Sequence, residues 1–176
     1  MSNSRRIQAI CAIGVLSVLL GCDSKEPPKA VSGTSKAAPN VLMSSFPIQE
    51  VNQTRQAGGA CNIDRINDKP RSPGSISVSG SLAVYGWAAI DPKNGVVPEA
   101  VVVVLKGPDG GEKFALAVRD PREDVAKSFG QPKLRDAGFV LKTDISTFKG
   151  AYEIGVIQIF EGKTYACSVL QKLNAG

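Results

Sequence analysis

Residues 82–90 read LAVYGWAAI, and residues 100–106 read AVVVVLK. The first stretch alternates, which places Tyr85 and Trp87 on one face of a strand and the aliphatic side chains on the other. The second stretch is β-branched and almost continuously apolar, as in a strand that is covered on both faces. Both patterns predict β-strands at the centre of the fold.

Stretches of the same kind flank these two, and turn residues separate them. Residues 107–111 read GPDGG and residues 161–163 read EGK, which is typical of tight turns. The expected strands are residues 61–66, 75–79, 82–90, 99–106, 112–119, 138–144, 151–160 and 163–172. Several short strands joined by such turns predict an all-β fold, a single antiparallel β-sandwich over residues 58–176.

One stretch, residues 119–139, interrupts this pattern. Asp120 and Glu123 have the spacing of a helix capping box, with a proline between them at the first helical position. The apolar face of this helix consists of Val125, Ala126 and Phe129. Gly130 then ends it. We expect one short helix, inserted between two strands at one end of the sandwich.

The order GWAAID, valine-rich strand, R-x-D-V-A-x-x-F and DAGF resembles a small immunoglobulin-like module of bacterial envelope proteins, sometimes appended to membrane-bound sugar transferases. The resemblance spans roughly residues 78–160. Its residues are Gly86, Trp87, Asp91, Asp124, Val125, Phe129, Gly138 and Phe139. It implies an immunoglobulin-like sandwich and no particular activity.

The N-terminus has the architecture of an export signal. Arg5 and Arg6 precede an uncharged apolar run, residues 7–20. This run is shorter than the about 20 residues that a membrane-spanning helix needs. We therefore expect residues 1–21 to direct export and to be removed.

The end of this run, Leu19-Leu20-Gly21-Cys22, resembles the lipobox of bacterial lipoproteins. In that family the chain is cut before the cysteine, which then carries acyl chains that anchor it. An ordinary secretory signal with a chance cysteine is the alternative. Asp23 resembles the inner-membrane retention signal of enteric-type lipoproteins. The expected location is the bacterial cell envelope, lipid-anchored through Cys22 and facing the periplasm, with the inner membrane favoured by Asp23.

Residues 22–57 are rich in proline, serine, lysine, glutamine, asparagine and threonine and show no period. This composition predicts a flexible, disordered tether, and about 35 such residues have a mean reach of ~30 Å. A more apolar patch within it consists of Val41, Leu42, Met43, Phe46 and Ile48. We interpret the patch as part of the tether. Docking on the domain or on a partner is the alternative.

The four cysteines have different expected fates. Cys11 leaves with the signal and Cys22 is the expected lipid site, so Cys61 and Cys167 remain. Two cysteines in an exported domain favour a disulfide, and two buried free thiols are the alternative.

The charge of the mature chain is mildly positive. Once Arg5 and Arg6 are removed, 19 of the 21 basic residues and all 16 acidic residues leave a formal charge of +3. No run of five basic residues appears, whereas nucleic-acid binding needs a clustered basic patch. We expect no nucleic-acid partner.

The residue inventory restricts the possible chemistry. The chain has no histidine, which excludes Ser-His-Asp and Cys-His catalysis and histidine-ligated metals. No phosphate-binding loop or EF-hand loop is present, and residues 91–95 have the composition of a turn. The acidic residues near the expected helix are Asp120, Glu123, Asp124 and Asp136. Capping and pairing with arginines explain them more simply than a glycosidase pair. We expect no catalytic residue, cofactor or metal.

The remaining interpretation is a non-catalytic binding or assembly module with an envelope protein as its partner. Its expected surface is the helix-bearing end, through Arg119, Arg122, Lys127, Lys133 and Arg135. The alternative is a domain that binds or cleaves envelope polysaccharide, with Tyr85, Trp87 and Tyr152 as a stacking platform. Against that alternative, a tryptophan in the middle of a strand is commonly a core residue.

Overall fold

The computed structural model describes residues 40–49 and 51–176. The predicted signal peptide, Cys22 and residues 23–39 of the predicted tether lie outside this range. Within it, no helix has the length and hydropathy of a membrane span.

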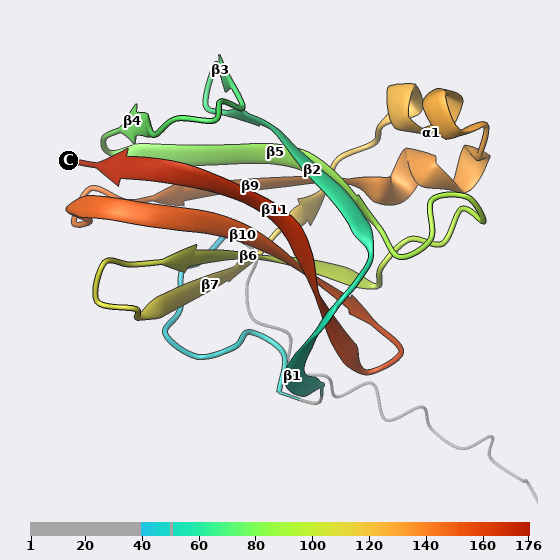
Figure 1. Ribbon diagram of the computed structural model, residues 1–176, viewed down its shortest axis with the longest axis horizontal. Coiled ribbons are helices and arrows are strands. Elements are labelled where there is room, and N and C mark those ends of the chain that lie inside the picture. The colour runs from blue at the N-terminus through green and yellow to red at the C-terminus, as the bar shows by residue number, and fades with distance from the viewer. Residues whose placement is uncertain (1–39, 50) are drawn as a thin grey trace, which may run out of the picture. The chain divides into compact units, whose positions relative to one another are not determined.

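Two sheets make up the fold (Figure 1). The larger sheet has the order β1 (Asn52–Ala57), β11 (Lys163–Ala175), β10 (Gly150–Phe160), β6 (Ala100–Lys106) and β7 (Glu112–Leu116), with β4 (Ile76–Val78) also paired to β11. The smaller sheet has the order β3 (Lys69–Pro70), β2 (Ala60–Ile66), β5 (Ser81–Ala89), β9 (Gly138–Asp144) and β8 (Val118–Arg119). Strand pairs are antiparallel, except that β1 and β4 run parallel to β11. The predicted all-β class with one short α-helix is confirmed.

The main core lies between the two sheets and follows the predicted alternation. Leu82 and Val84 of β5 are fully buried there, facing Val101 and Val103 of β6. The other face of β6 is also buried, in a second apolar cluster that includes Val102. The prediction that residues 100–106 are covered on both faces is therefore confirmed.

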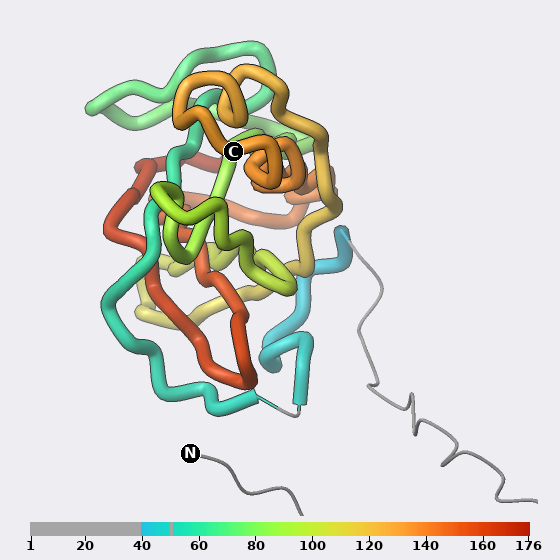
Figure 2. Tube along the Cα trace, turned by 90° about the vertical axis from the view of Figure 1, so that its right-hand side faces the viewer, coloured from blue at the N-terminus to red at the C-terminus, as the bar shows by residue number. Residues whose placement is uncertain are grey.

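The cover over the second face comes from the predicted tether. Residues 40–49, which we call the strap, run along one side of the domain (Figures 1 and 2). Phe46 and Ile48 are each only 6% exposed and pack on β6, β7 and β10. β1 then pairs with β11. A disordered tether is thus wrong for residues 40–49 and 52–57, and the domain begins earlier than residue 58. The alternative interpretation of the apolar patch, docking on the domain, is the one that the structure supports.

The predicted strand over residues 112–119 is two strands in different sheets. β7 ends at Leu116, and β8 begins at Val118 in the other sheet. The amide of Ala117 still bonds the carbonyl of Val101. No glycine or proline marks this switch in the sequence.

The inserted helix, α1 (Glu123–Phe129), begins later than the capping box predicts. Its N-cap is Arg122, and no side chain caps it. Asp120 instead donates its backbone N–H to the carbonyl of Gly138, which keeps it extended beside β9. This tertiary pairing overrides the local cap. Gly130 ends the helix with φ 64°, as predicted, and a 3₁₀ helix, η1 (Pro132–Ala137), follows that was not predicted.

Cys61 on β2 and Cys167 on β11 are paired, with Cα atoms 6.2 Å apart. This agrees with the predicted disulfide. The pair joins the two sheets directly, across a sequence separation of 106 residues.

Candidate functional site

The five basic residues of the predicted surface do not form one basic patch. Arg119 is exposed, but its guanidinium donates to the backbone carbonyls of Asp136, at 3.0 Å, and Pro98. Partial burial of this guanidinium lowers its pKa. Arg119 therefore links η1 to the loop that precedes β6.

Arg122 holds the start of α1 against β2. Its guanidinium makes a bidentate pair with Asp124, at 2.7 and 2.6 Å, and a further ion pair with Asp64 of β2. These hydrogen bonds raise the pKa of Arg122, and the same pairing lowers the pKa of Asp124 to about 2. Arg122 therefore has a structural role as a pin that fastens α1 to β2, and its charge is compensated by Asp64 and Asp124.

The other three basic residues lie on the surface. Arg135 pairs with Glu123 at 2.6 Å, and both side chains are mostly exposed. Lys127 and Lys133 are exposed and form no salt bridge within the part of the chain that the structure describes. The helix-bearing end thus shows mixed charges with two lysines left over.

An exposed aromatic pair lies among these charges. The rings of Trp87 and Phe129 meet edge to face, with centroids 5.5 Å apart. Trp87 is half-buried, and Phe129 is 40% exposed. The pair rests on a small apolar cluster that contains Val125, Ala126 and Leu134. Val125 and Ala126 of the predicted apolar face are buried, whereas Phe129 packs on Trp87 but stays 40% exposed, because it is the last residue of a very short helix. The sequence contained no signal for this.

A polar hollow of about 290 Å³ adjoins this pair on the outer face of the smaller sheet. Its lining residues are Asp64, Arg65, Tyr85, Asp120 and Arg122. The guanidinium of Arg65 lies 3.9 Å from the centroid of the Tyr85 ring. The ion pair between Arg122 and Asp64 and the stacking of Arg65 on Tyr85 hold the lining of this hollow in place.

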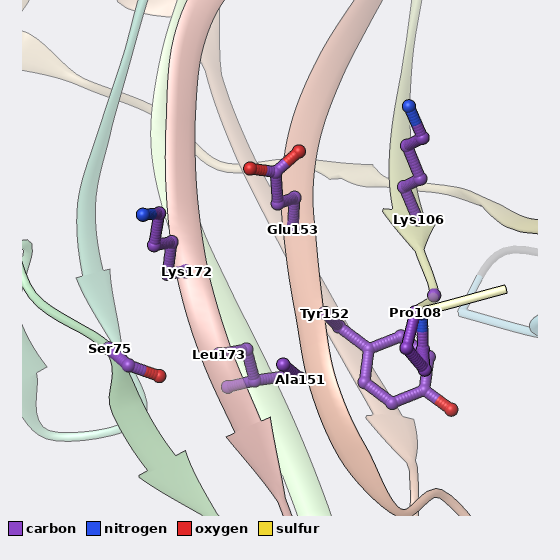
Figure 3. Close-up of a pocket in the computed structure, with 9 residues that line it drawn as sticks. Ser75, Lys106, Pro108, Ala151, Tyr152, Glu153, Lys172 and Leu173 are labelled. Atoms are coloured by element: carbon purple, nitrogen blue, oxygen red, sulfur yellow. The ribbon is translucent and has the colours of Figure 1, made fainter. Parts of the chain in front are cut away.

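Tyr152 is remote from Tyr85 and Trp87. It belongs to β10 in the larger sheet, where it stacks on Phe148 at 5.4 Å and lines a separate hollow of about 360 Å³ (Figure 3). In this hollow, Glu153 lies between Lys106 and Lys172 (Figure 3), its partners across the sheet. The three residues of the alternative stacking platform therefore belong to different sheets.

Two of the four carboxylates expected at the helix-bearing end, those of Glu123 and Asp124, form ion pairs. Among the described residues, no group of three or more acidic, cysteine or histidine side chains could hold a metal ion. Residues 91–95 form the expected turn, in which Asp91 accepts the backbone N–H groups of Lys93 and Asn94. The side-chain amide of Asn94 also donates to Asp91, at 2.7 Å, and this bond is the main reason that the pKa of Asp91 is lowered.

No protein-family model matches this chain, and a comparison with curated proteins finds no significant match.

Proposed function

We propose that this chain is a lipoprotein of the bacterial envelope, anchored through Cys22, whose β domain is a non-catalytic binding or assembly module for an envelope protein. The two facing sheets and the short inserted helix support the finer assignment of an immunoglobulin-like sandwich. Loops and edge strands of such sandwiches are well suited to binding.

One observation carries the proposal: the Trp87–Phe129 pair, in which Phe129 is exposed and Trp87 is half-buried, lies at the helix-bearing end among charged residues. Protein interfaces typically have an aromatic centre and a polar rim, and their aromatic residues supply most of the binding energy. Arg135–Glu123 and the Arg122 pairs form such a rim here. Because these charges are already compensated, we expect Phe129 to be the anchor and the charges to select the partner.

The strap is attached to strands other than β2, which lines the polar hollow beside the proposed binding surface. Asn40 is the first described residue, and it bonds β7 through its backbone and β9 through its side chain. β2, which holds Asp64 beside the polar hollow, lies two strands away from β9 in the smaller sheet. The chain between Cys22 and Asn40 can span at most about 60 Å. The attachment of Asn40 and the polar hollow therefore involve different strands of the smaller sheet.

The anchor is tested by acyl labelling in the native host. Cys22→Ser should abolish incorporation of a labelled fatty acid and leave unprocessed precursor. Cys11→Ser, the matched control within the signal, should be labelled and processed normally. Normal processing and membrane partition of Cys22→Ser would show that the lipoprotein assignment is wrong.

The binding surface is tested by co-purification from gently solubilised membranes. Phe129→Ala should reduce the recovery of the partner at least tenfold, since a buried aromatic anchor is worth ~2 kcal/mol or more. Leu170→Ala, which also truncates an exposed side chain but on the larger sheet, should leave recovery unchanged. Equal recovery with both variants, or recovery of glycan without protein, contradicts the proposal.

A further inference from the structure

We infer that the strap, residues 40–49, can detach from the domain. The chain between the anchor and the domain then has two lengths, one with the strap bound and a longer one with the strap released. The biological use of this device rests on the proposed lipid anchor. The release itself does not, because it depends only on contacts within the domain.

The strap is attached at a few separate points rather than by a continuous ladder. Asn40 donates its N–H to the carbonyl of Leu116 at 2.9 Å, and its side chain accepts the N–H of Lys142 at 3.0 Å. Met43 exchanges two backbone hydrogen bonds with Phe114, each 2.8 Å long. Both attachments lie on edges of the sheets, so they can break without opening the strand pairs of either sheet.

The side chains of the strap also pack outside the main core. Phe46 meets Phe114 edge to face, with ring centroids 5.5 Å apart, and Ile48 joins the same outer cluster. Only Leu42 contacts the core between the sheets, as a partly buried neighbour. The core between the sheets and the Cys61–Cys167 pair do not include the strap, whereas its release uncovers the outer cluster, in which Val102 is fully buried.

The chain that follows the strap is held differently, which sets where release stops. Asn52 donates its N–H to Gly162 at 2.9 Å, and the fully buried Thr164 hydroxyl lies 3.0 and 3.1 Å from the carbonyls of Asn52 and Thr54. Arg55 makes a bidentate pair with Glu112. β1 thus remains on β11, and opening up to residue 51 frees about 40 Å of contour length.

Hydrogen exchange of the mature chain in solution tests the release. The amides of Met43 and Phe114 each donate to the carbonyl of the other residue. We expect these two amides to exchange at least tenfold faster than those of β10 and β6. Phe46→Ala should raise the exchange of Met43 at least tenfold more and leave β10 unchanged. Val41→Ala is the matched control in the strap, since Val41 is 50% exposed, and it should change neither. Exchange of the Met43 amide at the rate of β10 in the unmodified chain overturns the inference.

Stretching of single molecules tests where the release stops. One handle replaces the lipid at the N-terminus of the mature chain, and the other is attached at Lys127, on the proposed binding surface. We expect a first gain in length of less than about 40 Å before the domain unfolds, because the folded distance between Asn40 and Asn52 is subtracted from the freed contour length. A first gain of more than about 40 Å, which would include β1, or unfolding in one step overturns the inference. Neither measurement uses lipid or a partner, so a negative result leaves the proposed function standing, and failure to find an anchor leaves the release intact.

Discussion

Arg55 and Glu112 form a bidentate ion pair, 2.8 and 2.6 Å between their nitrogen and oxygen atoms, although they belong to opposite edge strands of the larger sheet. Arg55 lies on β1 and Glu112 on β7, with three strands between them in the sheet order. The sheet must therefore curl strongly for the two edges to meet. Arg55 also lies over the ring of Phe114, 5.5 Å from its centroid, so the pair closes the outer apolar cluster at one end.

This pair should stabilise the fold modestly and in a pH-dependent way. A double-mutant cycle with Arg55→Ala and Glu112→Ala should give a coupling of ~0.5–1 kcal/mol at pH 7, since both side chains are partly exposed. The pairing lowers the pKa of Glu112 below its ordinary value of 4.5. The stabilisation is therefore complete above about pH 4.5 and is lost as the pH falls through the folded-state pKa. Urea unfolding at pH 7 and at pH 3 measures it; an unchanged coupling at pH 3 contradicts this account.

The carboxylate of Asp124 should report directly on the pin at the start of α1. In the folded protein it should titrate with a pKa of about 2, chiefly because it accepts hydrogen bonds from Arg122. In Arg122→Gln its pKa should return toward the ordinary value near 3.9. Arg135→Gln is the matched control, because Arg135 pairs with Glu123 instead. NMR titration of the side-chain carboxyl measures the pKa. A shift of equal size in both variants would count against a specific pin.

Gly138 should not tolerate a side chain. A Cβ there would lie 1.9 Å from the carbonyl oxygen of Asp120 and 2.4 Å from Cγ of Arg122. Gly138→Ala must therefore displace the segment that leads into α1, and we expect a loss of ~2–4 kcal/mol in the free energy of unfolding, as in overpacked cores. At Gly74 the nearest atom would be 3.7 Å away, so Gly74→Ala should have little effect. Chemical denaturation of the two variants provides the comparison. Equal stabilities of the two variants would contradict the close approach of Gly138 to the backbone of Asp120.

The Cys61–Cys167 pair should contribute strongly to stability. It closes a loop with a sequence separation of 106 residues, for which the chain-entropy account gives ~4–5 kcal/mol as an upper value. The double variant with serine at both positions should unfold at lower denaturant concentration than the oxidised chain. A reducing agent should lower the stability of the unmodified chain and leave the variant unchanged. Two alkylatable thiols in protein taken from the periplasm contradict the pairing.

The strands that the sequence predicts well are those whose burial follows from neighbouring residues. Leu82 and Val84 alternate with Tyr85 and Trp87, and this local pattern matches the faces of β5. The strap was mistaken for tether because Phe46 and Ile48 are buried mainly by residues of β6, β7 and β10, which are more than fifty positions away. Asp120 failed as a cap for the same reason, since Gly138 holds its backbone extended.

The helix-bearing end was predicted from the sequence, but the contacts of its residues were not. Residues 119–137 contain the helix, yet Arg119 and Arg122 bond other parts of the domain. Phe129 is exposed because it is the last residue of α1, and its ring contacts that of Trp87 on β5. Helical spacing alone places it with Val125 on the buried face. Charge composition predicts where a surface lies, whereas ion-pair partners and the end of a short helix are set by tertiary contacts.

Site-specific photocrosslinking in living cells tests most directly whether the helix-bearing end binds an envelope protein. A photoreactive amino acid placed at Lys127, exposed on α1, should trap one reproducible membrane or periplasmic protein, and Phe129→Ala should abolish the product. The same group placed at Leu170, exposed on the larger sheet, should trap nothing comparable. An identical set of products at both positions, or none at Lys127 in cells that retain the folded and anchored chain, would contradict the account.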